Sequence, residues 1–232
     1  MRKRLETAVR ELTRPINGQY PRPWMTEMAD PENAEVFIVG YNQATGFPVG
    51  SINSHETYVS ALFNVKSGSC RRLYDKMRGN NGPSPTRKNI DSLNKMLLAE
   101  RIEKIIETNV ICYSTPMSSD LGSHAHTGGK EAGREIFLEL IRTIRPKVLI
   151  AHGEGTKKEL ERVLGVKAPA LPENGDGAVC SVHQQVAGLG APYDPMIIFV
   201  PSLAPPKWNS WSNWAPAHLK AVASQASKFL RS

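Results

Sequence analysis

The sequence predicts an α/β protein, a three-layer α/β/α sandwich around a central sheet of four mainly parallel strands. Four short and almost continuously apolar segments recur along the chain, as expected for strands covered on both faces: 35–40, 109–113, 147–151 and 196–200. Segments with helical spacing of apolar residues separate these strands, and such alternation builds a parallel sheet through right-handed crossovers. The length of 232 residues suits one large domain, so we expect a single domain over 1–232.

The expected helices follow from the spacing of apolar residues and from helix breakers. Residues 1–14 have helical spacing and lead into a Pro-rich stretch that cannot be regular helix, so 1–30 forms an N-terminal helix and extended segment. The chain between the other predicted elements is expected to be irregular, notably over 118–129 and 165–194. The remaining predicted helices cover 70–78, 87–107, 130–144, 156–164 and 216–230.

Composition narrows the class of protein. Lys and Arg number 29 against 22 Asp and Glu, a net charge of +7 that favours a polyanionic partner without naming it. The three cysteines, Cys70, Cys112 and Cys180, are widely spaced, which excludes a disulfide framework and a paired-cysteine metal site. No apolar stretch resembles a secretory signal or a membrane span. We therefore expect a cytoplasmic protein that does not bind membranes.

The ends of the four strands predict where the site lies. In parallel sheets, ligands bind beyond the carboxyl ends of the strands. Each of the four ends here carries Gly, Pro or a small polar residue, and we expect these ends to converge on one site: 40–44, 114–116, 152–154 and 200–202.

Several common motifs are absent. No GxGxxG follows the first strand, and no GxSxG occurs. The sequence 128–130 resembles the end of a phosphate loop, but Glu131 follows where Ser or Thr would bind magnesium. The pair His124 and His126 lacks a third ligand at usual spacing, so no metal is expected.

Two longer segments carry a resemblance to a known family. Residues 37–48 contain Gly40 and Asn42 at the end of the first strand, and 199–208 contain Pro201-Ser202 at the end of the last. Together with 20–24 and 144–153, they resemble motifs of the uracil-DNA glycosylase superfamily, in the same order along the chain and over about residues 20–230. The resemblance implies an enzyme that hydrolyses the N-glycosidic bond of a base flipped out of DNA and leaves an abasic site.

The resemblance also implies roles for individual residues. Asn42 matches the residue that orients the attacking water; the alternative is that Asn42 only adopts left-handed backbone geometry in a turn. Residues expected to line the base pocket are Gly40, Tyr41, Gln43, Ala44, Phe47, Ser114, His152 and Val200. Residues expected to bind DNA are Pro201, Ser202, Leu203, Lys207 and Trp208.

One of the residues from 203 to 211 is expected to fill the gap that the extruded nucleotide leaves. Leu203 and Trp208 are the candidates, and each could equally be a core residue. Trp211 and Trp214 recur at the same spacing, and we interpret them as cover for the core.

Four positions depart from the family pattern. Val200 replaces the usual His or Asn, Gln43 replaces Pro, and Ser114 is a shorter group than the usual Asn. Ala44 stands where the uracil-only branch has a bulky Tyr that excludes substituents at pyrimidine carbon 5. These changes favour a substrate enlarged at carbon 5, such as a modified cytosine of phage DNA, and hence an anti-phage defence enzyme rather than a repair enzyme.

Further side chains complete the hypothesis. Because an amide is a poor general base, Asp120 and Glu154 are candidate catalytic carboxylates. His55 could contact base or phosphate, and DNA backbone contacts are possible for the basic pairs 71–72, 87–88 and 157–158; all of these could equally be solvated surface residues.

Two other functions remain open. A non-catalytic DNA-binding protein on the same fold would explain Val200 and Gln43, and an enzyme acting on free nucleosides would not need the basic charge. The chain lacks the four cysteines with which many relatives hold an iron–sulfur cluster, so no cofactor is expected, and no obligate protein partner is evident.

Overall fold

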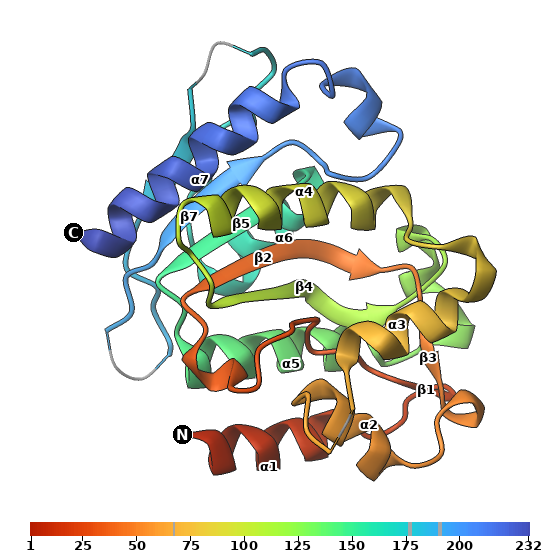
Figure 1. Cartoon of the computed structure of the whole chain (residues 1–232). Helices are drawn as coiled ribbons and strands as arrows, with labels where there is room; N and C mark the ends of the chain where they lie inside the picture. The colour runs from red at the N-terminus through yellow and green to blue at the C-terminus, as the bar shows by residue number, and fades with distance from the viewer. Residues whose placement is uncertain (67, 176–177, 190–191) are drawn as a thin grey trace. The chain divides into compact units, whose positions relative to one another are not determined.

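The computed structural model describes residues 1–66, 68–175, 178–189 and 192–232. It is an α/β structure whose main sheet has five strands in the order β4-β2-β5-β7-β6 (Figure 1). The α/β prediction is confirmed, but the prediction of four strands is wrong. The strands of this sheet are β2 (Val36–Gln43), β4 (Ile105–Ser114), β5 (Val148–His152), β6 (Cys180–His183) and β7 (Met196–Val200).

The unpredicted strand, β6, is at the edge of the sheet and pairs with β7 in the antiparallel direction. Its residues are half-buried or exposed, so it lacks the continuous apolar run that identified the other four. A second, two-stranded sheet pairs β1 (Gln19–Tyr20) with β3 (Phe47–Pro48). The Pro-rich segment thus contributes a short strand.

Seven α-helices are described, and most lie where the apolar spacing predicts them: α1 (Arg2–Leu12), α2 (His55–Leu62), α3 (Cys70–Arg78), α4 (Pro85–Ala99), α5 (Gly129–Ile144), α6 (Glu154–Leu164) and α7 (Ala215–Arg231). The described residues also include six 3₁₀ helices: η1 (Pro31–Asn33), η2 (Val49–Ser51), η3 (Gly79–Asn81), η4 (Ser118–Gly122), η5 (His124–His126) and η6 (Lys207–Ser210).

Two helix predictions are wrong in detail. The helix expected over 87–107 ends at Ala99, because Arg101 has a left-handed φ of 64° and the chain then enters β4. Helix α2 lies in a stretch expected to be irregular; its start is set by Ser54, whose Oγ accepts a hydrogen bond from the backbone N–H of Thr57.

The chain divides into two compact units. Unit 1 comprises 1–34, 40–82 and 106–145, and unit 2 comprises 35–39, 83–105 and 146–232. Each unit therefore contains segments that are far apart in the sequence.

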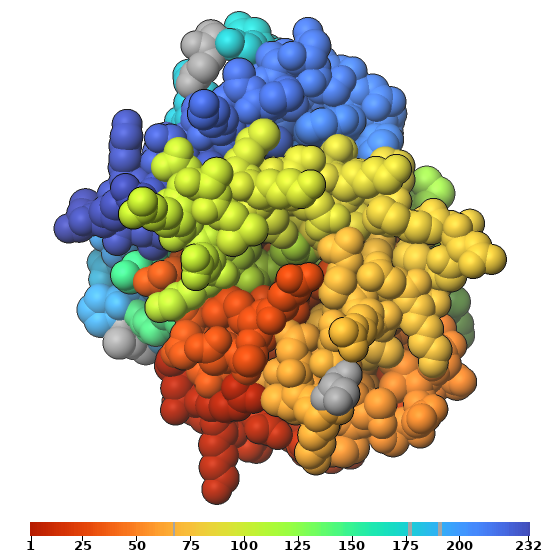
Figure 2. All heavy atoms as spheres, viewed as in Figure 1, coloured from red at the N-terminus to blue at the C-terminus, as the bar shows by residue number. Residues whose placement is uncertain are grey.

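In unit 2, β5 pairs with β2 and with β7 in parallel register. Because side chains alternate along a strand, every second residue points to the face that α4 and α7 cover. These two helices contact each other, and their outer surfaces form adjoining bands in Figure 2. The buried core on this face includes Ile38, Ile150, Ile198, Leu97 and Val222. Helix α6 contacts β5 and has no residue in this core cluster.

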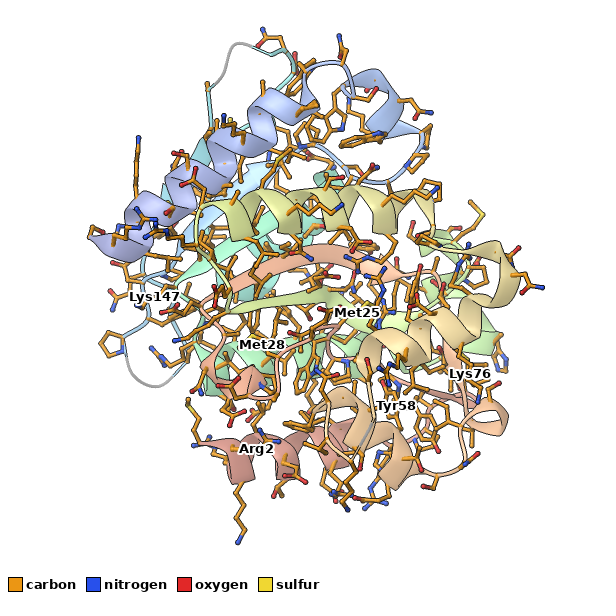
Figure 3. The ribbon with its side chains drawn as sticks, in the orientation of Figure 1. Arg2, Met25, Met28, Tyr58, Lys76 and Lys147 are labelled. Atoms are coloured by element: carbon orange, nitrogen blue, oxygen red, sulfur yellow. The ribbon has the colours of Figure 1, made fainter. Side chains whose placement is uncertain are left out.

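In unit 1, α1 contacts α5, and α2 contacts α3. Tyr58 of α2, labelled in Figure 3, is fully buried, and its hydroxyl donates a 2.7 Å hydrogen bond to the carbonyl of Pro21. Tyr20 stacks on the Tyr58 ring at a centroid distance of 4.8 Å. These contacts fix the Pro-rich segment against α2.

Within the described residues, no helix is both long enough and apolar enough to cross a membrane.

Candidate functional site

Asn42, the predicted catalytic residue, is the second-last residue of β2. Its φ is not among the positive values in the described chain, so the alternative of a left-handed turn residue is wrong. The side chain is half-buried, and the neighbouring residue Gln43 is buried. Alternation along the strand directs these two amides to opposite faces of the sheet.

A hydrogen-bonded network orients the Asn42 amide. The Nδ2 of Asn42 donates a 2.8 Å hydrogen bond to Oγ1 of Thr115, just beyond β4. The hydroxyl of Thr115 in turn donates to the carbonyl of Met117 at 2.7 Å. Because the proton of Thr115 is used there, its oxygen accepts from Asn42, which requires the NH₂ group to face Thr115. The Oδ1 of Asn42 therefore faces away, and it makes no hydrogen bond within the described residues.

The loop after β4 is held in one conformation next to this amide. The backbone N–H of Met117 donates to Oδ2 of Asp120 at 2.9 Å, and the N–H of Asp120 donates to the carbonyl of Met117 at 3.1 Å. Asp120 thus accepts a backbone hydrogen bond at the start of η4. Its carboxylate stabilises the loop, which argues against the predicted catalytic role.

Two glutamine side chains near the ends of β2 and β4, Gln43 and Gln19, are held by hydrogen bonds to backbone carbonyls. The Nε2 of Gln43 donates to the carbonyl of Arg22 at 2.8 Å, and that of Gln19 donates to the carbonyl of Ser114 at 3.0 Å. The Oε1 atoms of both glutamines are buried without a hydrogen bond in the described chain. The hydroxyl of Ser114 donates to the carbonyl of Thr45 at 3.1 Å, so this predicted base-reading group is used by the protein itself.

Other predicted pocket residues of unit 1 differ in exposure. Phe47 is buried between the Tyr58 ring, 5.6 Å away in an edge contact, and the Arg22 guanidinium, 5.5 Å from its centroid. Phe47 is therefore a core residue and not a pocket wall. Ala44 is exposed and Tyr41 is half-buried, whereas Gly40 is buried.

In unit 2, the ends of β5 and β7 lie side by side. His152 and Val200 are register partners, and the N–H of Gly153 donates to the carbonyl of Val200 at 2.9 Å. Gly153 has a φ of +90°, and a Cβ added there would lie 3.3 Å from the Cβ of Ser202. The left-handed backbone and the close approach to Ser202 both favour glycine at this position.

His152 is a neutral imidazole at neutral pH. Burial, and secondarily the positive charge of Arg87, lowers its pKa to about 4. The ring as a whole is only half-buried, yet its Nδ1 is buried without a hydrogen bond in the described residues. A neutral imidazole can both donate and accept a hydrogen bond.

The predicted DNA-binding segment after β7 begins with buried residues and becomes exposed further along. Val200 and Leu203 are each 0% exposed and belong to the core below α7. Leu203 is held further by Asn89, whose Nδ2 donates to its carbonyl at 2.8 Å. Leu203 is thus a core residue, which is the alternative that the sequence left open for it.

Four other residues of this segment have distinct positions. Pro201 is buried, Ser202 is half-buried, Lys207 is exposed and Trp208 is half-buried. Trp208 contacts the ring of Trp211 edge-on at 5.0 Å, and Trp211 is buried. The interpretation of Trp211 as core cover is confirmed. Trp214 packs against the same ring.

The remaining predicted residues have surface or structural roles. Glu154 is exposed and pairs with Lys158 across 3.8 Å on α6, which is the usual contact one helical turn apart. His55 lies next to Thr13, with Nε2 3.1 Å from its hydroxyl, and stacks on Tyr20. Neither residue is part of the Asn42 network.

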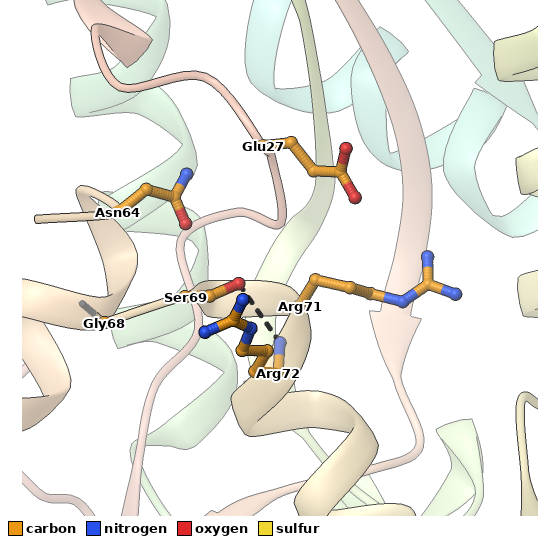
Figure 4. A pocket seen from close by; sticks show the side chains of 6 residues that line it. All are labelled: Glu27, Asn64, Gly68, Ser69, Arg71 and Arg72. Atoms are coloured by element: carbon orange, nitrogen blue, oxygen red, sulfur yellow. Dashed lines mark hydrogen bonds between the residues drawn. The ribbon is translucent and has the colours of Figure 1, made fainter.

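Unit 1 also contains a cavity of about 410 Å³ beside α3 (Figure 4). The predicted DNA-contacting arginines Arg71 and Arg72 line it, with Glu27, Asn64 and Ser69 among the other lining residues. Arg71 also pairs with Asp75 at 3.4 Å. The residues of the Asn42 network do not line this cavity.

The structure thus brings the predicted site residues together in two groups. Asn42, Gln43 and Ser114 belong to unit 1, and His152, Val200 and Ser202 belong to unit 2. Sequence reasoning missed Thr115 as a partner of Asn42, although the run of hydroxyl residues before Pro116 was a signal for it. No group of three or more potential metal ligands occurs among the described residues.

No protein-family model matches the chain, and no curated protein matches its sequence.

Proposed function

We propose that this protein is a DNA glycosylase that uses Asn42 to position the water that attacks the sugar of a flipped nucleotide. The observation that carries the proposal is the orientation of the Asn42 amide. Its NH₂ group donates to the Thr115 hydroxyl at 2.8 Å, so the carbonyl oxygen of this half-buried side chain faces away from Thr115. Such an oxygen can accept a hydrogen bond from water but cannot take up a proton at neutral pH.

An oriented amide suits a reaction in which bond breaking is well advanced before water attacks. Glycosidic cleavage proceeds through an oxocarbenium-like sugar, which needs a correctly placed water more than a strong base. The carbonyl dipole of Asn42 also stabilises the developing positive charge of the sugar. Successive hydrogen bonds from Asp120 to Met117, Thr115 and Asn42 hold that dipole in place.

The proposed substrate is a pyrimidine enlarged at carbon 5, such as a modified cytosine of phage DNA. Ala44 is exposed and projects only a methyl group at the position where the family's uracil-only branch has a tyrosine. This proposal depends on the resemblance of 37–48 and 199–208 to the uracil-DNA glycosylase superfamily.

In unit 2, we assign contacts with DNA to Ser202, Lys207 and Trp208, which are exposed or half-buried. A hydroxyl and an ammonium group bind backbone phosphates, and an indole offers a face for stacking.

One observation favours a second candidate, a non-catalytic DNA-binding protein. Both predicted catalytic carboxylates have structural partners, Asp120 with the Met117 N–H and Glu154 with Lys158. A glycosylase would then depend on Asn42 alone for positioning water.

Base release from defined oligonucleotides distinguishes the two candidates. The protein is incubated with duplexes that contain uracil, a thymine mismatch, 5-hydroxymethylcytosine or its glucosylated form, and alkali then converts abasic sites into strand breaks. We expect breaks with at least one modified cytosine, and a loss of about 100-fold or more in single-turnover rate for Asn42→Ala.

Binding to the same duplexes provides the control. Asn42→Ala should retain DNA affinity within about threefold, because the half-buried amide contributes little charge. Salt-dependent binding without breaks on any substrate would instead establish the second candidate.

A further inference from the structure

Met117 is a large apolar side chain on the surface of unit 1. It is 66% exposed, and the other exposed large apolar residues in the described chain are Met1 at 66% and Leu98 at 51%. Leu98 lies in the last turn of a regular helix, α4. Met117 lies on the loop that holds Asn42, which gives its exposure a functional context.

The backbone of Met117 is fixed although its side chain is free. Its N–H donates to the Asp120 carboxylate at 2.9 Å, and its carbonyl accepts from the Thr115 hydroxyl at 2.7 Å and from the Asp120 N–H at 3.1 Å. Pro116 restricts the preceding residue, and Leu121 anchors the following turn as a buried side chain. Because the loop backbone is already held in this way, only the Met117 side chain has to become ordered on binding.

The same hydrogen bonds fix Met117 relative to the Asn42 amide. The Met117 carbonyl is joined to Asn42 through one intervening side chain, Thr115, by bonds of 2.7 Å and 2.8 Å. A ligand whose reacting atom lies at Asn42 Oδ1 is therefore within a few ångströms of this loop. If that ligand is a flipped nucleotide, the vacated position in the base stack lies next to it.

We propose that Met117 inserts into the DNA base stack and fills the space that the extruded nucleotide leaves. This inference rests on the proposed function, because it assigns the partner of the same loop. Unstacking a base step is costly, and an apolar side chain that replaces the lost contacts repays part of that cost. Methionine suits this role because its flexible, polarisable side chain adapts to neighbouring bases.

The candidates that sequence reasoning named fit the role less well. Leu203 is 0% exposed and belongs to the core. Trp208 is half-buried and is held edge-on against Trp211. Around Met117, by contrast, Ser118, Ser119 and Ser123 are exposed and carry hydroxyls of the kind that contact phosphates on either side of an inserted residue.

The test compares Met117→Ala with Met117→Leu, which restores an apolar side chain of similar volume. Leu98→Ala is the matched control, since it removes an exposed apolar side chain of unit 2. Each variant is assayed for single-turnover base release from a duplex and from the corresponding single strand. Stack insertion matters only in the duplex, because a single strand has no vacated position to fill.

We expect Met117→Ala to lower the duplex rate by about 10- to 100-fold and the single-strand rate by less than about threefold. Met117→Leu and Leu98→Ala should stay within about threefold of the parent protein on both substrates. An equal loss on both substrates, or an unchanged duplex rate in Met117→Ala, would overturn the proposal.

A binding assay separates this inference from the proposed glycosylase activity. A duplex with 2-aminopurine beside the target base fluoresces more strongly when the neighbouring step is unstacked. We expect the parent protein to increase this fluorescence, and Met117→Ala to lose the increase at saturating protein, whether or not any base is released. No increase with the parent protein, or an equal increase with both, would contradict insertion; absent base release on every substrate would contradict the glycosylase activity alone.

Discussion

The amide nitrogen of Asn42 donates a 2.8 Å hydrogen bond to the hydroxyl oxygen of Thr115, a residue 73 positions later in the chain. Thr115 is 1% exposed, and its own proton is committed to the Met117 carbonyl. A buried hydroxyl with one acceptor and one donor partner leaves a single arrangement for the amide. The position of the Asn42 carbonyl oxygen is thus decided by a neighbouring element and not by β2.

Replacing Thr115 tests this relationship. Thr115→Val keeps the volume but removes the acceptor of the Asn42 NH₂ group and the donor to Met117. We expect the single-turnover rate of base release to fall about 10- to 100-fold, with DNA affinity nearly unchanged, because the amide is no longer held. Thr115→Ser restores the hydroxyl and should recover most of the rate. Equal rates for the Val and Ser variants would show that Thr115 has only a packing role.

Asn42→Asp should change the pH dependence of the reaction. A carboxylate is a better general base than an amide, and the Thr115 hydroxyl can turn to donate to it. We expect activity at pH 7 equal to or above that of the parent protein. We also expect a loss of activity below about pH 4–5, where an ordinary aspartate becomes protonated. A variant as inactive as Asn42→Ala across the pH range would show that the carbonyl does not contact the water.

His152 should make folding stability depend on pH. Its pKa is lowered to about 4 from its usual 6.5, so between these values the unfolded chain takes up a proton that the folded chain does not. The stability that the neutral imidazole contributes is present above pH 6.5 and is lost as pH falls toward 4. We expect a loss of about 1–3 kcal/mol over this window, the range allowing for the partial exposure of the ring.

Urea unfolding of the parent protein and of His152→Asn at several pH values measures this loss. The variant should lose less free energy of unfolding than the parent as pH falls from 7 to 4. The exposed residue His124 provides the control, and His124→Asn should behave as the parent does. Identical slopes for parent and His152→Asn would contradict the assignment.

Gly153→Ala should destabilise unit 2. The φ of +90° is strained for a side-chain-bearing residue, and the new Cβ would press on Ser202 at 3.3 Å. We expect a cost of about 1–3 kcal/mol in the free energy of unfolding. Gly50→Ala is the matched control, because a Cβ there meets nothing within 4 Å, and it should change stability by less than about 0.5 kcal/mol. Equal stability of the two variants would refute the close approach.

Glu154→Gln tests whether the carboxylate after β5 has a chemical role. Glu154 is exposed and its partner Lys158 is a surface residue one helical turn away. We expect base release to change by less than about threefold, since a surface ion pair contributes little. If Glu154→Gln instead lowered the rate of base release as much as Asn42→Ala, Glu154 would have a catalytic role.

The apolar pattern predicted the four buried strands because each is an almost uninterrupted run of apolar residues, as in 196–200. It missed β6, whose half-exposed residues Cys180–His183 pair only at an edge and need no such run. It extended one helix to 107 because Ile102 continued the helical spacing, whereas the left-handed backbone at Arg101 ends the helix. The local spacing of apolar residues indicates which residues are buried, but it does not indicate where the backbone turns.

The sequence alone determined that the chain is α/β, where its buried strands lie and that Asn42 is near the end of the first of them, because these properties depend on the spacing of apolar residues. The tertiary structure decided what each polar side chain contacts. In the tertiary structure, Asn42 is hydrogen-bonded to Thr115 and Asp120 to the Met117 backbone. Leu203 is buried, and Met117 is exposed. Hydrogen bonds and burial arise between residues far apart in the chain, so their partners are set only when the strands come together.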